Sequence, residues 1–361
     1  MTSEPIRQAQ GRPIRQAQSR PIRQAQGRPI RQAHRHEPRH EYSRWRGKPK
    51  VAIVGVGPVG GILAAHLARA HHYVVLCDIQ KPHLDVIKDR GLSITGFLEM
   101  TAQCERAAYS VSELSNFPEV NTIIISTKAS VLPRLVPEIA KIARPGTRLI
   151  SCQNGLDNEE YLAEAFGPDN VLRIVVNFAG SQMGDGHIAM SFFNAPNYIG
   201  AMTGKSEPLA RQMAEMMTEA GLDTQFTQNI KKYEWEKVIL NTALSATCAL
   251  TRKSMKDMMD FEQTELLAEE LMREGVEVAE AAGVKFDEGF LEHGIQYLKK
   301  AGYHRTSMHQ DILRRLPTEI DWLNGRIVER GRALGLQTPY NFTITALIKG
   351  LEMESGAPEE D

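Results

Sequence analysis

Val51-Ala52-Ile53-Val54-Gly55-Val56-Gly57-Pro58-Val59-Gly60 is the most informative stretch of the sequence. It opens with an apolar run typical of a buried strand, and a helical pattern follows it through His71. A Gly-x-Gly-x-x-Gly spacing between a strand and a helix indicates a dinucleotide-binding loop, because it permits a tight turn, close approach of a pyrophosphate and close helix packing. The alternative is a glycine turn that binds nothing. The predicted cofactor-binding residues of this loop are Gly55, Gly57, Pro58, Val59 and Gly60.

A second apolar run, residues 73–77, closes a strand–helix–strand unit of the expected length, and Asp78 follows it. In the dinucleotide-binding pattern, a carboxylate at this place hydrogen-bonds the adenosine ribose. A 2′-phosphate would face like charge there, so Asp78 predicts a preference for NAD(H). Lys81 and His83 lie close by in sequence and keep NADP(H) possible. The alternative for Asp78 is a solvated turn aspartate.

Further strand-like runs lie at residues 122–126 and 148–152, with a helical stretch from about Leu132 between them. Continuous Val/Ile strands that alternate with helices imply a parallel sheet covered on both faces. The predicted fold class is therefore α/β, with an N-terminal Rossmann dinucleotide-binding domain.

Beyond residue 171 the pattern changes to short strands broken by turn residues, up to about Met202. A helix capped by Ser206, with Pro208 in its first turn and Gly221 as its stop, should follow. After Gln228 the sequence is almost wholly helical, which predicts an all-α C-terminal domain. The expected divisions are a disordered Arg/Gln-rich repeat tail at 1–48, a Rossmann NAD(P)-binding domain at 49–227, a helical substrate and dimerisation domain at 228–352, and a disordered acidic C-terminus at 353–361.

Residues 5–34 repeat the unit Pro-Ile-Arg-Gln-Ala-Gln-Gly/Ser-Arg, a composition that predicts disorder. Such a tail is either a neutral repeat expansion or misplaced start, or a basic interaction arm. Residues 1–50 hold 13 of the 43 Lys and Arg residues but only 3 of the 44 Asp and Glu residues. The remaining body is acidic, which argues against nucleic acid as its partner.

The four cysteines, Cys77, Cys104, Cys152 and Cys248, are too scattered for a zinc site or a disulfide framework, and no metal site is predicted. Cys77 and Cys152 lie in strand-like runs and are expected to be buried. No apolar run approaches the length of a membrane span, and the N-terminus lacks the apolar segment of a secretory signal. A reducing cytoplasm, with no membrane partner, is the expected location.

Lys237, Asn241 and Ser245 recur every four residues in an otherwise apolar helical stretch. This spacing places them on one helix face. A buried lysine and a buried amide need polar partners, so the face meets either a ligand or a satisfied structural network. A long helical half with apolar faces is also compatible with a homodimer.

A second polar cluster contains Ser307 and, further along, Thr318 and Glu319. Thr318 is expected to cap a new helix after Pro317, which places Glu319 in the first turn, where the helix dipole stabilises a carboxylate. The alternative reading of Glu319 is an ordinary helix-start residue.

Taken together, these motifs resemble the ketopantoate reductase family from about Lys50 to Leu351. The residues that carry the resemblance are Gly55-x-Gly57-x-x-Gly60, Thr127-Lys128, Gln153-Asn154-Gly155, Lys237 with Asn241, and Ser307 followed by Thr318-Glu319-Ile320-Asp321. The resemblance implies a Rossmann domain followed by a helical domain, with substrate and nicotinamide in the cleft between them.

The resemblance also implies roles for single residues. Lys237 matches the family's general acid, and Glu319 matches the carboxylate beside the nicotinamide ribose. Lys128 matches a lysine that reaches towards cofactor and substrate, and Asn154 borders both. The substrate-side positions are Asn154, Asn241, Ser245 and Ser307.

The sequence departs from the family pattern at two places. Ser245 stands where a second asparagine is usual, and Lys253-Ser254-Met255-Lys256 stands where an Asn-Gly pair is usual. The expected activity is NAD(P)H-dependent reduction of a small-molecule 2-oxo acid to the 2-hydroxy acid, with ketopantoate to pantoate, a step of pantothenate biosynthesis, as the family default. The alternatives are an NAD-dependent D-2-hydroxyacid dehydrogenase for another 2-oxo acid and a non-catalytic nicotinamide-binding protein.

Overall fold

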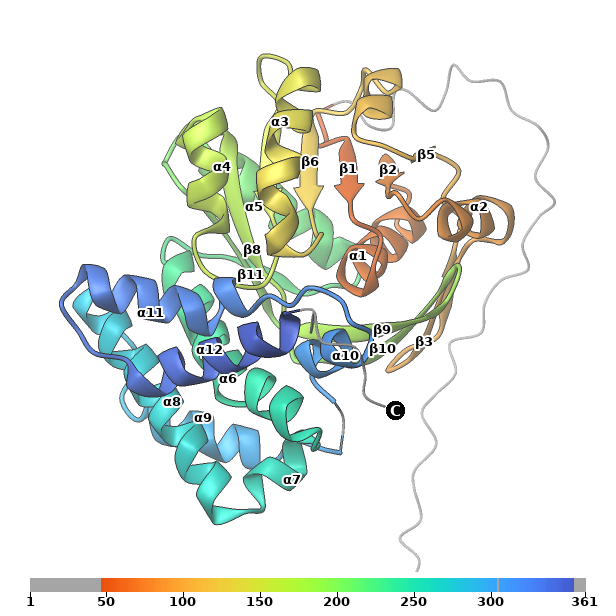
Figure 1. The fold of residues 1–361 in the computed structure, drawn as a ribbon. Helices are drawn as coiled ribbons and strands as arrows, with labels where there is room; N and C mark the ends of the chain where they lie inside the picture. The colour runs from red at the N-terminus through yellow and green to blue at the C-terminus, as the bar shows by residue number, and fades with distance from the viewer. Residues whose placement is uncertain (1–46, 304, 354–361) are drawn as a thin grey trace, which may run out of the picture. The chain divides into compact units, whose positions relative to one another are not determined.

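The computed structural model describes residues 47–303 and 305–353. The disorder predicted for the repeat tail and for the acidic C-terminus concerns residues that lie almost entirely outside these ranges. Figure 1 shows strands and their covering helices in the first part of the described chain and helices alone in the second. The predicted α/β class with a helical C-terminal region is confirmed.

The larger sheet has eight strands in the order β12-β11-β8-β7-β6-β1-β2-β5. Every neighbouring pair in it is parallel except β8 and β11. Its strands are β1 (Val51–Val54), β2 (Val74–Cys77), β5 (Ala107–Ala108), β6 (Thr122–Ile125), β7 (Arg148–Ser151), β8 (Val171–Val175), β11 (Asn197–Ala201) and β12 (Thr224–Phe226). Each strand predicted as a continuous apolar run is present, and Cys77 and Cys152 are buried as expected.

The strand order reverses between β1 and β6. From β1 the chain crosses to β2 on one side and later returns to β6 on the other. In an open parallel sheet, the carboxyl ends of the strands at such a reversal form the usual ligand-binding crevice. Gly55 follows β1 and Ser126 follows β6, so the glycine loop lies at this reversal point.

A second, four-stranded sheet in the order β4-β3-β10-β9 was not predicted. Its strands are β3 (Leu92–Gly96), β4 (Met100–Ala102), β9 (Phe178–Gly184) and β10 (His187–Phe193). Helix α1 (Pro58–Arg69) packs against this sheet and against the larger one, as Figure 1 shows. The approach is close, because a Cβ atom added to Gly61 would lie 2.2 Å from Cδ1 of Ile188.

The other helices of this part are α2 (Lys81–Arg90), α3 (Leu132–Ile142), α4 (Asn158–Phe166) and α5 (Glu207–Glu219). Pro208 lies in the first turn of α5 and Gly221 follows its end, as predicted. The predicted cap is wrong in its chemistry, since Ser206 precedes α5 but its hydroxyl donates to the carbonyl of Thr203 at 3.2 Å.

From Ile230 onward the described chain contains helices and no strand. The helices are α6 (Ile230–Thr251), α7 (Met255–Met259), α8 (Glu262–Ala281), α9 (Phe290–Lys299), α10 (Ser307–Leu313), α11 (Asn324–Ala333) and α12 (Pro339–Glu352). Helix α6 packs against α8, α10 and α12, so it is buried along much of its length. None of the described helices is long and apolar enough to span a bilayer.

Candidate active site

The glycine loop has the geometry that its spacing predicts. Gly55 has φ +93°, and a Cβ atom there would lie 2.7 Å from the backbone nitrogen of Thr127. A Cβ atom on Gly60 would lie 2.0 Å from the carbonyl oxygen of Gly55, so no larger residue fits. A Cβ atom on Gly57 would meet no described atom within 4 Å. The open side of the loop is therefore at Gly57, where a ligand can approach the backbone.

The start of α1 is suited to an anion. Among residues 47–303 and 305–353, no side chain caps this helix, and Pro58 and Val59 form its first turn. Uncapped N–H groups and the helix dipole favour a phosphate at this position. The open Gly57 and the uncapped helix start together fit the pyrophosphate of a dinucleotide.

Asp78 and His83 both hydrogen-bond the backbone of Val56, the residue between Gly55 and Gly57. The Asp78 carboxylate accepts the N–H of Val56 at 2.6 Å and that of Gln80 at 2.9 Å. Nδ1 of the buried His83 accepts the N–H of Gly186 at 3.1 Å, so Nε2 carries the proton and donates to the carbonyl of Val56 at 3.0 Å. His83 is thus a structural brace and is not available for a cofactor phosphate.

The segment after β6 meets the segment before α11. Nζ of Lys128 donates to the carbonyl of Pro317 at 2.8 Å and pairs with Asp311 at 2.6 Å. The N–H of Ala129 donates to Oε1 of Glu319 at 3.0 Å. These contacts join the sheet part of the chain to the helical part directly at the predicted site.

Glu319 lies before a short 3₁₀ turn, Ile320–Trp322, and not in the first turn of an α-helix. The prediction of a new α-helix at Thr318 is therefore wrong; Thr318 instead accepts the N–H of Ile320 at 3.2 Å, and the next α-helix begins at Asn324. Burial raises the pKa of Glu319, although the hydrogen bond from the N–H of Ala129 acts to lower it. Hydrogen bonding with the side chain of Asn154 also acts to lower this pKa, so the two side chains are neighbours.

The turn that carries Asn154 is fixed against the same segment. Gly155 has φ +95°, and a Cβ atom there would lie 2.6 Å from the carbonyl oxygen of Trp322. That carbonyl accepts the N–H of Leu156 at 3.1 Å. The close approach requires glycine, and it seats Asn154 next to the residues that follow Glu319.

Lys237 is partly buried on α6, and its Nζ donates to the carbonyl of Val176, directly after β8, at 2.7 Å. Burial lowers the pKa of Lys237 to about 8, and the charge of Arg173 acts in the same direction. Cys152 and Glu319 act to raise this pKa, so both groups are near the amine. The pKa of this ammonium therefore lies near ordinary pH, so the group can release a proton there.

Asn241 and Ser245 follow Lys237 on the same helix. Ser245 is 8% exposed, and its carbonyl accepts the hydroxyl of Thr306, the residue before Ser307, at 3.1 Å. The side chains of Asn241 and Ser307 make no hydrogen bond to another described residue. The predicted substrate-side residues are thus assembled from α6 and the start of α10, with two polar groups left over for a ligand.

The predicted residues share one edge of the larger sheet. Gly55, Lys128, Asn154 and the Val176 carbonyl follow β1, β6, β7 and β8, which run parallel. The carboxyl ends of parallel strands meet at the same edge. The site is therefore an arrangement that the strand order itself builds.

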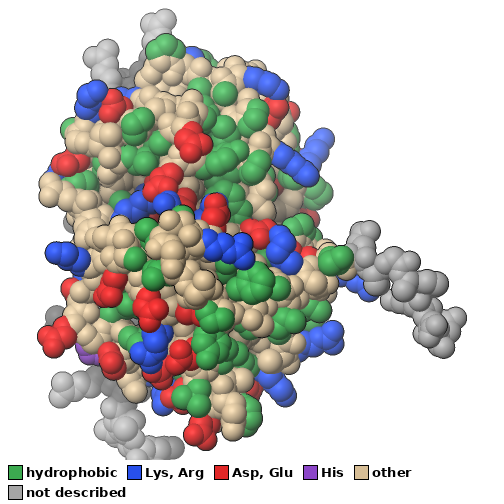
Figure 2. Space-filling view, turned by 60° about the vertical axis from the view of Figure 1, so that its left-hand side comes forward, with side chains coloured by type: hydrophobic (Ala, Val, Ile, Leu, Met, Phe, Trp, Pro, Cys, Tyr) green, Lys and Arg blue, Asp and Glu red, His purple; other side chains and the backbone are tan. Residues whose placement is uncertain are grey.

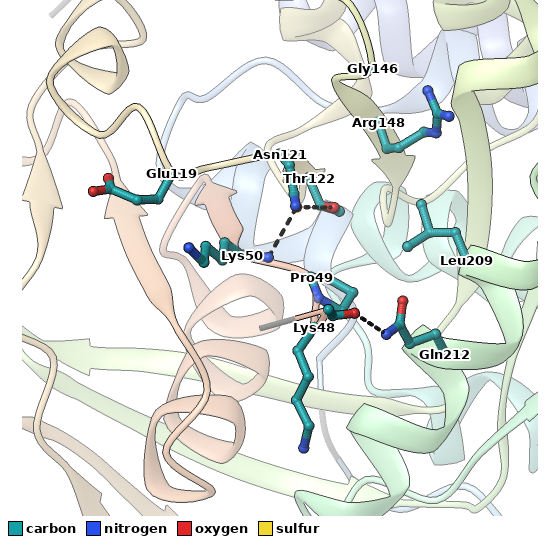
Figure 3. Close-up of a pocket in the computed structure, with 11 residues that line it drawn as sticks. Lys48, Pro49, Lys50, Glu119, Asn121, Thr122, Gly146, Arg148, Leu209 and Gln212 are labelled. Atoms are coloured by element: carbon teal, nitrogen blue, oxygen red, sulfur yellow. Dashed lines mark hydrogen bonds between the residues drawn. The ribbon is translucent and has the colours of Figure 1, made fainter. Parts of the chain in front are cut away.

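A separate cavity of about 460 Å³ lies at the opposite edge. Figure 3 shows its lining, in which the N–H of Lys50 donates to Asn121 at 3.0 Å. Thr122 and Arg148, which also line it, begin β6 and β7. This cavity is at the amino ends of the strands and has no part in the site described above.

Two residues of the site were missed by the sequence analysis. Asp311 pairs with Lys128, but nothing in its local sequence marks it, because the pairing depends on the packing of α10. Arg173 is 3% exposed in β8. The signal was present in that case, since a charged residue interrupts the apolar run Val171-Leu172-Arg173-Ile174-Val175.

The fold and the site together fit one class of protein: a Rossmann-type oxidoreductase that uses a nicotinamide dinucleotide and has a helical C-terminal part. The family described as "Ketopantoate reductase PanE/ApbA" matches residues 51–204, and its counterpart described as "C terminal" matches residues 229–352. The chain belongs to the ketopantoate reductase family.

Relatives support the same assignment. A 2-dehydropantoate 2-reductase of Streptococcus pyogenes serotype M3 is 30% identical over 308 residues, which cover 84% of this chain and 97% of the relative. That of Pyrococcus abyssi is 28% identical over 307 residues, 85% and 99% of the two chains.

Solved structures agree in fold. A family ketopantoate reductase from Ralstonia eutropha superposes with a TM-score of 0.75 at 27% identity, over 84% of this chain and 98% of the other. A D-mandelate dehydrogenase, solved with NADH and anilino(oxo)acetate, has a TM-score of 0.76 at 24% identity over 84% and 97%. The second comparison concerns the fold alone.

Proposed function

We propose that this protein reduces a 2-oxo acid to the 2-hydroxy acid with a reduced nicotinamide dinucleotide, and that Lys237 donates the proton. The observation that carries the proposal is the ammonium of Lys237, partly buried and held by the Val176 carbonyl at 2.7 Å near Glu319. A binding protein without catalysis has no need of such an amine.

The chemistry divides between cofactor and protein. A bound reduced nicotinamide supplies hydride to the keto carbon. Negative charge then builds on the keto oxygen, and the ammonium of Lys237 neutralises and protonates it. We assign Glu319, which the N–H of Ala129 fixes, to the ribose next to the nicotinamide, and Asn154 beside it to the orientation of both ligands.

The dinucleotide would be held by the loop Gly55–Gly60 and by the start of α1. We propose a preference for NAD(H), from the carboxylate of Asp78 at the end of β2. His83 is committed to the backbone of Val56, which removes one of the two basic residues that kept NADP(H) open. The other basic residue is Lys81, whose Nζ lies 5.6 Å from the centroid of the Tyr109 ring.

The substrate side favours a 2-oxo acid with an apolar side chain. Ser254, in the segment that departs from the family pattern, caps α7 in a reciprocal hydrogen-bonding arrangement with Asp257. Met255 packs on the helical core. Because these residues are committed to structure, they offer no partner for the C4 hydroxyl of ketopantoate. Ketopantoate remains the family default, and a plain 2-oxo acid is the favoured alternative.

We also propose the division at residues 227 and 228 into a Rossmann and a helical domain, and a homodimer. The division falls between β12 and α6. Tyr340, Leu347 and Leu351 lie on one face of α12 and are 43%, 51% and 53% exposed, which supports an apolar contact between subunits. Light scattering after gel filtration decides between dimer and monomer.

The function is tested by oxidation of NADH and NADPH against a panel of 2-oxo acids. We expect turnover with at least one acid and formation of the 2-hydroxy acid. Tight cofactor binding without turnover across the panel would instead establish a nicotinamide-binding protein.

A further inference from the structure

Arg173 is a charged residue in the middle of an apolar strand. It lies in β8 (Val171–Val175), and its side chain is 3% exposed. A guanidinium that leaves water loses its hydration, so it is retained only where partners replace that hydration. The partners of Arg173 therefore indicate what the residue does.

One side of the guanidinium holds the turn that carries Asn154. Nη1 donates to the hydroxyl of Ser151 at 2.8 Å, and Nη2 donates to the carbonyl of Gly155 at 2.9 Å. Ser151 ends β7 and Gly155 follows Asn154 directly. The side chain of Arg173 and the backbone carbonyl of Trp322 thus both hold this turn.

The other side of the guanidinium faces two buried carboxylates. Nε lies 3.5 Å from Oε1 of Glu234 and 3.7 Å from Oε2 of Glu159. Lys231 pairs with both carboxylates, at 3.1 Å in the case of Glu234. Glu159 and Glu234 are each 1% exposed, so these charges interact with little screening by water.

The network extends outward to the surface through Asp157, Glu160 and Arg330. Nη2 of Arg330 lies 2.6 Å from both acidic residues. Acidic and basic side chains also lie side by side across the middle of the face drawn in Figure 2. Arg330 is 38% exposed and belongs to α11, so it is the solvent-facing counterpart of Arg173 in the same network.

Strand β8 and helix α6 meet twice, and the second meeting involves the proton donor. Glu234 pairs with Arg173, and one helical turn later Lys237 donates to the carbonyl of Val176, three residues after Arg173. Any shift of Arg173 relative to α6 therefore also shifts the amine of Lys237.

The titratable groups that face Lys237 come from three elements besides its own helix. Burial is the largest influence and lowers the pKa of Lys237. Cys152 after β7 and Glu319 before α11 act to raise this pKa, and Arg173 of β8 acts to lower it. Burial raises the pKa of the Cys152 thiol to about 11, so the thiol is neutral where Lys237 titrates. Of these groups, Arg173 alone favours loss of the proton.

We propose that Arg173 is a positioning residue of the reductase reaction, which holds the Asn154 turn in place and supplies the positive charge against which Lys237 gives up its proton. The inference rests on the proposed function. Arg173 itself touches neither substrate nor cofactor.

The test compares Arg173→Gln with Arg173→Lys. Removal of the positive charge should move the basic limb of the kcat/KM profile upward by about one pH unit, the low end of the shift that a nearby charge produces. Arg173→Lys keeps the charge, so its limb should stay near that of the unmodified protein even if turnover falls. The position of the limb separates the two roles of Arg173. Loss of the contacts to the Asn154 turn lowers the rate without moving the limb, whereas loss of the positive charge moves it.

Arg330→Gln is the matched control, since it removes one arginine charge from the solvent-facing part of the network. Its limb should not move. An unmoved limb in folded Arg173→Gln, or an equal shift in Arg330→Gln, would overturn the proposal.

If Arg173→Gln fails to fold, Glu234→Gln replaces it. Burial and the charge of Glu159 raise the pKa of Glu234, so only part of it is ionised. The ionised part partly cancels the positive charge of Arg173. The neutral amide of Glu234→Gln removes this negative charge, so the basic limb of the kcat/KM profile should move downward. An upward or absent shift contradicts the proposal, since general loosening of the site would expose the amine and raise its pKa.

Competitive acetylation of lysine amines across pH, followed by peptide mass spectrometry, measures the Lys237 titration without turnover. If the unmodified protein reduces no 2-oxo acid, the proposed function is wrong. If the labelling curve of Lys237 is the same in Arg173→Gln as in the unmodified protein, the inference about Arg173 is wrong. The two failures are therefore distinguishable.

Discussion

At the scale of single residues, the site depends on how the chain places one amine. Lys237 is held by a backbone carbonyl and faces both Arg173 and Glu319. The helical spacing with Asn241 predicts its face, but only the fold supplies its neighbours. The role of Lys237 as proton donor remains a prediction, and two measurements test it; a third at this scale concerns Asp78.

Lys237→Ala should lower kcat by roughly two to four powers of ten, the usual effect of removing a positioned general acid. Cofactor affinity should be nearly unchanged, because the glycine loop lies on other elements. The matched control is Lys232→Ala, since Lys232 is also on α6 but pairs with Asp287 at 2.7 Å. Equal activity of the two variants would exclude Lys237 as the acid.

The reductase reaction should lose activity as pH rises. Burial places the pKa of Lys237 at about 8, and only the protonated amine donates, so kcat/KM for reduction should fall through that pH. Oxidation of the 2-hydroxy acid needs the neutral amine and should rise over the same range. A reduction profile that stays flat to about two units above this pKa contradicts the assignment.

Asp78→Ser should improve the use of NADPH relative to NADH by removing like charge from the adenosine end. Because Asp78 also binds the N–H groups of Val56 and Gln80, both cofactors should bind more weakly. The ratio of the two kcat/KM values is therefore the informative quantity. A strong NADPH preference in the unmodified enzyme is the result against this reading.

At the scale of elements, the strand–loop–helix unit at the start of the described chain separates packing from binding. Gly60 is closed in by the carbonyl of Gly55 and the hydroxyl of Ser126, whereas Gly57 faces open space. The two glycines are thus required for different reasons, Gly60 for packing and Gly57 for ligand approach. Alanine substitution at each position distinguishes these reasons.

Gly60→Ala should destabilise the fold by roughly 1–3 kcal/mol, the usual cost of overpacking, and lower the melting temperature. Gly57→Ala should leave the melting temperature within error and raise the Kd for dinucleotide. Calorimetry for stability and titration of the cofactor measure both effects. If Gly57→Ala binds the cofactor normally, the pyrophosphate does not approach at Gly57.

The same scale explains what could be predicted from sequence. Strands β1 and β2 are continuous apolar runs, and β6 and β7 have apolar centres flanked by polar residues, so the sequence pattern alone predicts these four strands. The short strands predicted between residue 171 and Met202 include β9 and β10, but the smaller sheet itself was missed. It is closed by the pairing of β10 with β3, which lies about ninety residues earlier, and such pairing leaves no local signal. Glu319 was placed in the wrong kind of turn because a proline, a threonine and an acidic residue also precede short 3₁₀ segments.

At the scale of the described residues as a whole, the site is built by two parts of the chain that meet at the carboxyl edge of the sheet. Lys128 with Pro317 and Asp311, Ala129 with Glu319, and Lys237 with Val176 all cross between them. The family resemblance predicted that Lys128, Lys237 and Glu319 belong to one site, but it did not predict the partners that these contacts involve. The charged network of Arg173 could not be predicted, because its members are separated by up to 173 residues, as Asp157 and Arg330 are, and pair only in the folded chain.

The substrate choice follows from the same meeting of parts. Ser245 is nearly buried and Met255 packs on the helical core, so we expect 2-oxoisovalerate, which lacks the C4 hydroxyl, to be used at least as well as ketopantoate. Steady-state kcat/KM values for the two acids decide this. A hundredfold advantage for ketopantoate, about 2.7 kcal/mol of transition-state discrimination, would mean that other residues bind the hydroxyl.

The most direct test of the account is product formation by the purified full chain. NADH, NADPH and a 2-oxo acid are supplied in turn at a pH below the pKa of Lys237, and cofactor oxidised and 2-hydroxy acid formed are both counted. The account predicts equal amounts of the two, loss of both in Lys237→Ala, and retention of both in Lys232→Ala. Cofactor binding with no 2-hydroxy acid from any 2-oxo acid, or undiminished product from Lys237→Ala, would contradict it.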